Sequence, residues 1–273
     1  MPLPEYSAMP TAIESIPALI TTPCGPAGSG FCLRDQDCLF LVTANHVLYD
    51  DEDEMLCDYV DFAVWTHLDG EVTGRWKARI DLAALNPSHI IRISDFDLLA
   101  LHIGSVNDTD GIGKISFFDE VTTLEEEGEG IIHVQSRQMA RSFNDVKVGN
   151  EAVVVGYPLS ISLASPEQLD YERPLLRKGI IAGKNSKQES IILDCPVYQG
   201  NSGGPVLEIY RCGNHCTKNH FAMLGVVSQF IPFEQQWVNN QFGLHRTEWS
   251  NSGYSVVMPL DRLLDAIDIC SND

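Results

Sequence analysis

The sequence predicts an all-β fold that ends in one α-helix. About a dozen short apolar runs, rich in β-branched and aromatic residues, lie between residues 38 and 258, and Gly, Pro, Asn and Asp separate them. Runs of this length and spacing are typical of all-β domains, and so many of them fit two barrels or sandwiches better than one. The helix is predicted after Pro259, because apolar residues from Leu260 to Ile269 recur every three or four positions.

The composition excludes several classes of protein. Of the 273 residues, 44% are hydrophobic and 21% are charged. That is enough apolar material for a packed core, so the chain is not a disordered one. No run approaches the ~20 apolar residues that a membrane-spanning helix needs, and we expect no membrane partner. The N-terminal segment lacks the basic and apolar regions of a secretory signal, which favours a cytoplasmic location.

The charge balance bears on the partners. The chain has 38 Asp and Glu residues against 18 Lys and Arg residues, a formal net charge of −20. A surface this acidic repels phosphate backbones, so we expect no nucleic-acid partner. It would attract basic segments of a protein or peptide.

The elements are expected in a simple order along the chain. An acidic tract with two glycines, residues 124–130, is interpreted as part of a solvated linker near the middle. The predicted order is a surface lead-in over residues 1–20, an N-terminal β unit over 21–117, an interdomain linker region over 118–148, a C-terminal β unit over 149–258 and the helix over 259–273.

Eight cysteines raise the question of disulfides and metal. In a long chain without a leader, free buried thiols are favoured over one or two disulfides. The segment from Cys212 to Cys216, followed by His220, leaves three alternatives: a plain hairpin loop, which we favour, a disulfide, or a metal site. We expect no metal and no cofactor.

Three motifs carry the chemistry. Gly200–Pro205 (GNSGGP) surrounds Ser202 with glycines, which allow a tight turn and direct backbone N–H groups into one small space. Thr43–His46 (TANH) places a histidine just after an apolar strand, and a serine hydroxyl needs such a base to become nucleophilic. In Phe96–Leu101 (FDLLAL), Asp97 directly precedes a strand, where its carboxylate could orient the imidazole.

The order His46, Asp97, Ser202 resembles the chymotrypsin/trypsin superfamily of serine proteases, and most closely its bacterial trypsin-like peptidases, such as the protease domain of the heat-shock proteases. The resemblance covers roughly residues 25–270. It implies two six-stranded antiparallel β-barrels with the site between them, followed by the C-terminal α-helix. It also implies that His46, Asp97 and Ser202 are catalytic, and that the backbone N–H groups of Gly200 and Ser202 form an oxyanion hole.

The same resemblance suggests a substrate pocket. Pro196, six residues before Ser202, would line its base, and Ser228, Gln229 and Phe230 would pair with the substrate backbone. Phe230 either narrows the pocket, lies at its rim or is a core residue. Since Pro196 carries no charge, we expect small or medium apolar residues before the cleaved bond.

The predicted function is a serine endopeptidase that cleaves protein or peptide substrates through an acyl-enzyme intermediate. One alternative is a catalytically silent binding module that keeps the cleft for recognition. Another is a protease restricted to one partner and switched on by a loop rearrangement, which would need a regulatory protein.

Overall fold

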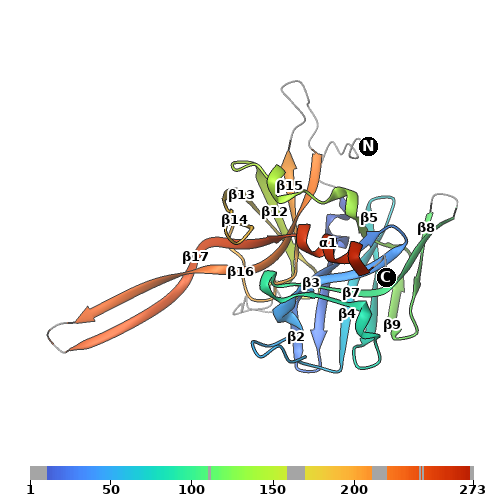
Figure 1. Cartoon of the computed structure of the whole chain (residues 1–273), viewed down its shortest axis with the longest axis horizontal. Helices are drawn as coiled ribbons and strands as arrows, with labels where there is room; N and C mark the ends of the chain where they lie inside the picture. The colour runs from blue at the N-terminus through green and yellow to red at the C-terminus, as the bar shows by residue number, and fades with distance from the viewer. Residues whose placement is uncertain are drawn as a thin grey trace, which may run out of the picture.

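The computed structural model describes residues 11–109, 112–158, 170–210, 220–239, 241 and 243–270. Strands dominate these residues, and the single α-helix, α1 (Asp261–Cys270), lies at their C-terminal end (Figure 1). The all-β class and the closing helix are therefore confirmed. Within the described part of the chain, no helix has the length and apolar character required to span a membrane.

The N-terminal unit is an eleven-stranded sheet. Its main ladder runs in the order β6-β7-β3-β2-β1-β4-β5-β9, while β8 pairs with β7, β10 with β4 and β11 with β2. The strands are β1 (Pro17–Thr22), β2 (Gly25–Asp35), β3 (Cys38–Ala44), β4 (Tyr59–Leu68), β5 (Glu71–Asp81), β6 (Ile90–Ile93), β7 (Leu98–Thr109), β8 (Ile112–Phe117), β9 (Val121–Gly128), β10 (Ile131–Ile132) and β11 (Val134–Ser136).

The C-terminal unit is a closed six-stranded barrel in the order β12-β13-β14-β17-β16-β15, as expected. The six strands are β12 (Glu151–Gly156), β13 (Leu175–Asn185), β14 (Ser190–Asp194), β15 (Pro205–Tyr210), β16 (His220–Asn239) and β17 (Leu244–Pro259). A short 3₁₀ turn, η1 (Thr11–Ser15), precedes β1, and five others lie between strands: η2 (Asn45–Val47), η3 (Pro87–His89), η4 (Ser94–Phe96), η5 (Arg137–Met139) and η6 (Phe143–Asp145).

The surface lead-in ends earlier than expected. Residues 17–22 form β1, a central strand that pairs with β2 on one edge and with β4 on the other. Ala18 and Ile20 are completely buried. The apolar run of this segment supplies a core strand, so the N-terminal sheet begins at Pro17 rather than after residue 20.

The acidic tract is a strand rather than a solvated linker. Residues 121–128 form β9, which pairs with β5. In the register of this ladder, Glu127 lies opposite Arg75 and Glu125 lies opposite Lys77. Opposite charges at facing positions stabilise an antiparallel pair. The acidic residues therefore lie opposite a basic strand that is distant in sequence.

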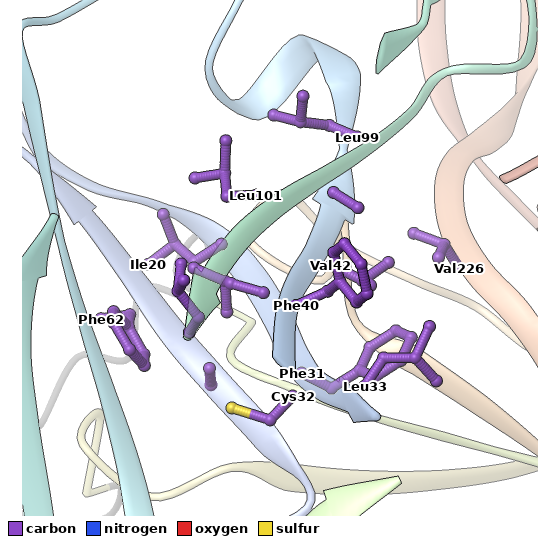
Figure 2. Packing of buried hydrophobic residues seen from close by; sticks show 14 of the residues in the cluster. Ile20, Phe31, Cys32, Leu33, Phe40, Val42, Phe62, Leu99, Leu101 and Val226 are labelled. Atoms are coloured by element: carbon purple, nitrogen blue, oxygen red, sulfur yellow. The ribbon is translucent and has the colours of Figure 1, made fainter. Parts of the chain in front are cut away.

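One hydrophobic cluster extends through both units. Figure 2 shows part of it around β2 and β3, where Phe31, Leu33, Phe40 and Val42 pack together and Val226 of the second barrel lies beside them. The apolar face of α1, with Leu263 and Ile267, packs into the same cluster. The two units therefore share buried surface, which fixes the relative positions of the loops that meet between them.

Two arginines attach the segment after β11 to both units. Arg137 bonds Asp35 of β2 at 2.8 Å and also pairs with Asp268 of α1. Arg141 bonds Glu208 of β15 at 2.8 Å, and the Glu208 side chain is only 1% exposed. A buried carboxylate needs such a partner, since leaving it unpaired is costly. These contacts hold the connection between the units against the body of the protein.

Five of the cysteines carry free thiols: Cys24, Cys32, Cys38, Cys57 and Cys195. Of these, only Cys32 and Cys195 are buried as expected, while Cys24 is exposed. Burial raises the pKa of Cys32 to about 12, so this thiol is inert. Cys212 and Cys216, with their three alternatives, lie outside the described residues.

The surroundings of His133 should make the stability of the protein depend on pH. Its ring centroid lies 5.3 Å from that of His67, and the two side chains help to line a cavity of about 1170 Å³ in the N-terminal unit. Burial, aided by the charge of His67, lowers the pKa of His133 from 6.5 to about 4. The unfolded chain therefore binds more protons between these values, and the free energy of unfolding should fall as pH drops from about 6.5 to about 4.

The slope due to His133 is at most about 1.4 kcal/mol per pH unit. Urea unfolding of the wild type and of His133→Gln at several pH values measures it. We expect the variant to lose this part of the pH dependence. Equal slopes in both proteins would contradict the assignment.

Candidate active site

The pairing of β3 with β7 brings His46 and Asp97 together. Ala44, the last residue of β3, lies opposite Leu98, the first residue of β7. His46 follows in η2, and Asp97 ends η4 in the left-handed conformation with φ 50°. The backbone N–H of Asn45 donates to the Asp97 carbonyl oxygen at 3.1 Å, which locks the two turns together.

The Asp97 carboxylate accepts hydrogen bonds from three groups. His46 Nδ1 lies 2.9 Å from Oδ2, and the His46 backbone N–H donates to Oδ1 at 3.0 Å. The Ser228 hydroxyl donates to Oδ2 at 2.6 Å. Burial opposes ionisation of Asp97, but the bonds and charge from His46 and the bond from Ser228 outweigh it and hold the pKa below its usual value. Asp97 is thus a charged acceptor that fixes the imidazole with Nδ1 toward it.

Ser202 lies in a turn held by both units. Its carbonyl oxygen accepts from Ser29 N of β2 at 2.8 Å, and the next N–H, of Gly203, donates to Val227 of β16 at 2.8 Å. The Ser202 hydroxyl donates to the Ser228 carbonyl oxygen at 3.3 Å. Ser202 therefore lies beside the residue whose side chain bonds Asp97, and its hydroxyl points to Ser228 rather than to the imidazole.

The turn contains two backbone N–H groups without an acceptor. Among the described residues, neither Gly200 N nor Ser202 N donates a hydrogen bond within the chain, whereas the intervening Asn201 N donates to Tyr198 O at 2.9 Å. Gly200 has φ +96°, a conformation that glycine adopts without strain. Stabilisation of an oxyanion requires unpaired N–H groups of this kind beside the serine hydroxyl.

Ser29 is a positioning residue that the sequence motifs did not indicate. Its buried hydroxyl donates to Gly200 O at 2.7 Å and accepts from Tyr157 N at 2.9 Å, while Thr43 Oγ1 donates to its carbonyl oxygen at 2.7 Å. One small polar residue thus connects the serine turn to the strand before His46. Its only sequence signal is a serine among the small residues that precede an apolar run.

Gly203 leaves no room for a side chain. It has φ +84°, and a Cβ there would overlap the Ser29 carbonyl oxygen and the Thr43 hydroxyl. We expect Gly203→Ala to displace Ser202 and to lower peptidase activity by about 100-fold or more, since small misplacements at a reacting centre have effects of this size.

Gly183→Ala is the matched control, because a Cβ at Gly183 meets nothing within 4 Å. Peptide hydrolysis and thermal unfolding of both variants provide the comparison. Unchanged activity in Gly203→Ala would show that the close packing around Gly203 is not needed to place Ser202.

The cleft between the two units has a volume of about 900 Å³. The residues predicted for catalysis and three of those predicted for substrate binding line it: His46, Asp97, Ser202, Ser228, Gln229 and Phe230. Phe230 is 42% exposed, which agrees with a position at the rim. The larger cavity beside His133 shares none of these residues.

Pro196 does not line the cleft. Its neighbour Val197 does, together with Tyr198 and Ser190. Residues 195–198 follow the end of β14 at Asp194 and belong to no strand, so the alternation of a strand does not assign their sides. The expectation for Pro196 is corrected to Val197. Within the described residues, no cluster of three or more His, Cys, Asp or Glu side chains could hold a metal ion.

Comparison with known proteins places this geometry in context. A family model described as a trypsin-like peptidase domain matches residues 28–211. This span contains His46, Asp97 and Ser202. Among curated proteins, none matches the chain.

Solved structures of similar fold share little sequence with the chain. Human heparin binding protein is 13% identical with a TM-score of 0.50, over 99% of this chain and 97% of that one. The protease Anisep from Arthrobacter nicotinovorans is 12% identical with a TM-score of 0.50, over 95% and 98%. The HtrA-type protease AlgW, solved with a decapeptide, is 14% identical with a TM-score of 0.46, and the chain spans 51% of its length.

Proposed function

The chain belongs to the trypsin-like peptidase family, and on that premise we propose that it is a serine endopeptidase with Ser202 as nucleophile. One observation carries the proposal: a half-buried, ionised Asp97 holds His46 Nδ1 at 2.9 Å in the same cleft as Ser202. This arrangement fixes Nδ1 of the ring and leaves Nε2 toward the cleft, which a histidine with a purely structural role does not need. A base in acyl transfer requires it.

The proposed mechanism follows from these positions. Ser202 Oγ attacks the carbonyl carbon of the substrate while His46 Nε2 accepts its proton, and Asp97 stabilises the imidazolium that forms. The N–H groups of Gly200 and Ser202 would bind the oxyanion. His46 then gives the proton to the leaving amine, and an acyl group remains on Ser202. Water, activated by His46, releases that group and restores the serine.

One contact of Ser202 supports the alternative in which a partner switches the peptidase on. In the structure the Ser202 hydroxyl donates to Ser228 O at 3.3 Å. Attack requires the hydroxyl to turn toward His46 Nε2. Substrate or a regulatory protein could favour that rotamer, because binding to one of two conformations shifts the population toward it.

The proposed specificity is for small or medium apolar residues before the cleaved bond. The cleft wall from the second barrel contains Val197, Val256 and Met258, and among its lining residues the carboxylates all come from the N-terminal unit. Lys187 lies on the second-barrel side. A basic side chain entering that side would meet like charge and lose its hydration, which is unfavourable.

A positional-scanning peptide library tests activity and specificity together. We expect cleavage after Ala, Val or Leu, and none in Ser202→Ala. A strong preference for Arg or Lys before the cut would contradict the proposed pocket. Absence of cleavage for every peptide would favour the silent module over the protease.

We also propose that the protein functions in a reducing compartment such as the cytoplasm. Cys24, Cys32, Cys38, Cys57 and Cys195 are free, and Cys24 is exposed. Free thiols persist where glutathione keeps them reduced. Immunoblotting of cell fractions with an antibody against the chain would show in which compartment the protein lies.

A further inference from the structure

A two-stranded ribbon extends far from the second barrel. β16 (His220–Asn239) pairs with β17 (Leu244–Pro259) along almost its whole length. β15 covers the other edge of β16 only as far as Val226, which lies opposite Pro205. Beyond that point the hairpin projects from the body as a long arm (Figure 1). We call residues 230–239 and 244–255 the arm.

The open edge of the arm begins at the catalytic serine. The Val227 carbonyl oxygen accepts from Gly203 N at 2.8 Å, and the Ser228 carbonyl oxygen faces the Ser202 hydroxyl at 3.3 Å. Because β17 occupies the opposite edge, the edge that faces Ser202 continues along the arm, with irregularities in the register between Val227 and Gln229 and between Phe230 and Pro232. Among the described residues, no other strand pairs with β16 beyond Val226. An unpaired strand edge is a template for another chain.

The arm exposes large apolar side chains on both of its faces. Side chains alternate along a strand, and directly paired residues share a face. Phe233 and Trp237 lie on one face, 49% and 60% exposed. Trp249 pairs with Glu234 and so lies on the opposite face with Val238; these two are 65% and 53% exposed.

This distribution fits an added strand better than a flat partner. A flat surface would cover one face of the ribbon and leave the other apolar set in water. A strand paired on the open edge points its own side chains alternately to both faces, so it contacts both sets. A third strand would also support the ribbon, since an isolated two-stranded hairpin has marginal stability in water.

We propose that the arm binds the part of the substrate chain that precedes the cleaved bond, as an antiparallel strand on the open edge of β16. This rests on the proposed peptidase function. A strand antiparallel to β16 with its cleaved bond at Ser202 runs outward along the arm toward its own N-terminus. From Phe230 to Val238 the edge is about 30 Å long and spans about nine residues. The substrate class is therefore an unfolded, extended segment with apolar or aromatic residues well before the cut.

Peptide length tests the proposal. Two peptides share the same residues around the cut, and carry about four or about twelve residues before it, the latter with alternating apolar side chains. We expect kcat/KM to be about tenfold or more higher for the long peptide. In the double variant Phe233→Ser, Trp237→Ser this advantage should fall to near unity, while cleavage of the short peptide is unchanged.

Leu68→Ser is the matched control, since Leu68 is an exposed apolar residue of β4, 46% exposed and outside the arm. It should keep the full advantage of the long peptide. Equal kcat/KM for both peptides in the wild type would overturn the proposal. So would concentration-dependent dimers that the double variant abolishes, because the arm would then bind a second copy. If the peptidase function itself fails, neither peptide is cleaved, which is a different result.

Discussion

Ser202→Ala and His46→Ala will each lower kcat/KM for peptide hydrolysis by about 10⁴- to 10⁶-fold. The first variant removes the nucleophile. The second removes the base that Asp97 orients through Nδ1 at 2.9 Å. Since the two residues act on the same proton, the double variant should be little worse than either single one.

Steady-state hydrolysis of an apolar peptide gives kcat/KM for both variants, and thermal unfolding shows whether they remain folded. Both side chains border the cleft, so the unfolding midpoints should stay close to that of the wild type. Additive losses in the double variant, or retained activity in both single variants, would show that Ser202 and His46 do not form one catalytic unit.

Asp97→Asn will lower kcat/KM by about 10⁴-fold with little change in fold. The carboxylate accepts from His46 Nδ1, from the His46 backbone N–H and from the Ser228 hydroxyl. An asparagine must present its NH₂ group to one of these donors. The NH₂ group then favours the wrong imidazole tautomer, and His46 Nε2 can no longer accept the proton of Ser202.

Ser228→Ala separates the two effects on Asp97. It removes one donor to Oδ2 at 2.6 Å but leaves the bond to His46, so the loss should be much smaller than for Asp97→Asn. A larger loss in Ser228→Ala than in Asp97→Asn would contradict the view that Asp97 acts by orienting His46.

The sequence motifs predicted the class of fold, and the three residues that they indicated line one cleft, because both results depend on local patterns. Short strands between turn residues indicate an all-β chain. Around Ser202, the glycines at 200 and 203 adopt positive φ values, which explains why such residues mark a tight turn. His46 and Asp97 were predicted from strand ends, and the structure brings them together through the pairing of Ala44 with Leu98.

Features that depend on distant partners were not predictable. The acidic strand β9 reads as a solvated tract until Arg75 and Lys77 of β5 are placed opposite its glutamates. Ser29 reads as an ordinary small residue until its hydroxyl meets Gly200 O, 171 positions later. The sequence also could not show that Pro196 lies outside the lining of the cleft, whereas the next two residues, Val197 and Tyr198, line it.

The sequence did not predict the arm, for a different reason. Its residues are polar and aromatic without strict alternation, so the sequence predicts no strand between residues 231 and 253. A strand buried on one face shows a period of two, whereas both faces of the arm are exposed. The pattern that normally marks a strand is therefore missing where the hairpin leaves the barrel.

Labelling with a fluorophosphonate probe, mapped by mass spectrometry, tests the central claim most directly. The probe reacts with a serine only when a base activates its hydroxyl. We predict labelling at Ser202 in the wild type, and none in Ser202→Ala or His46→Ala. Absence of labelling in the wild type, with or without a peptide substrate, or labelling of Ser202 that persists in His46→Ala, would contradict the assignment of this cleft as a serine protease active site.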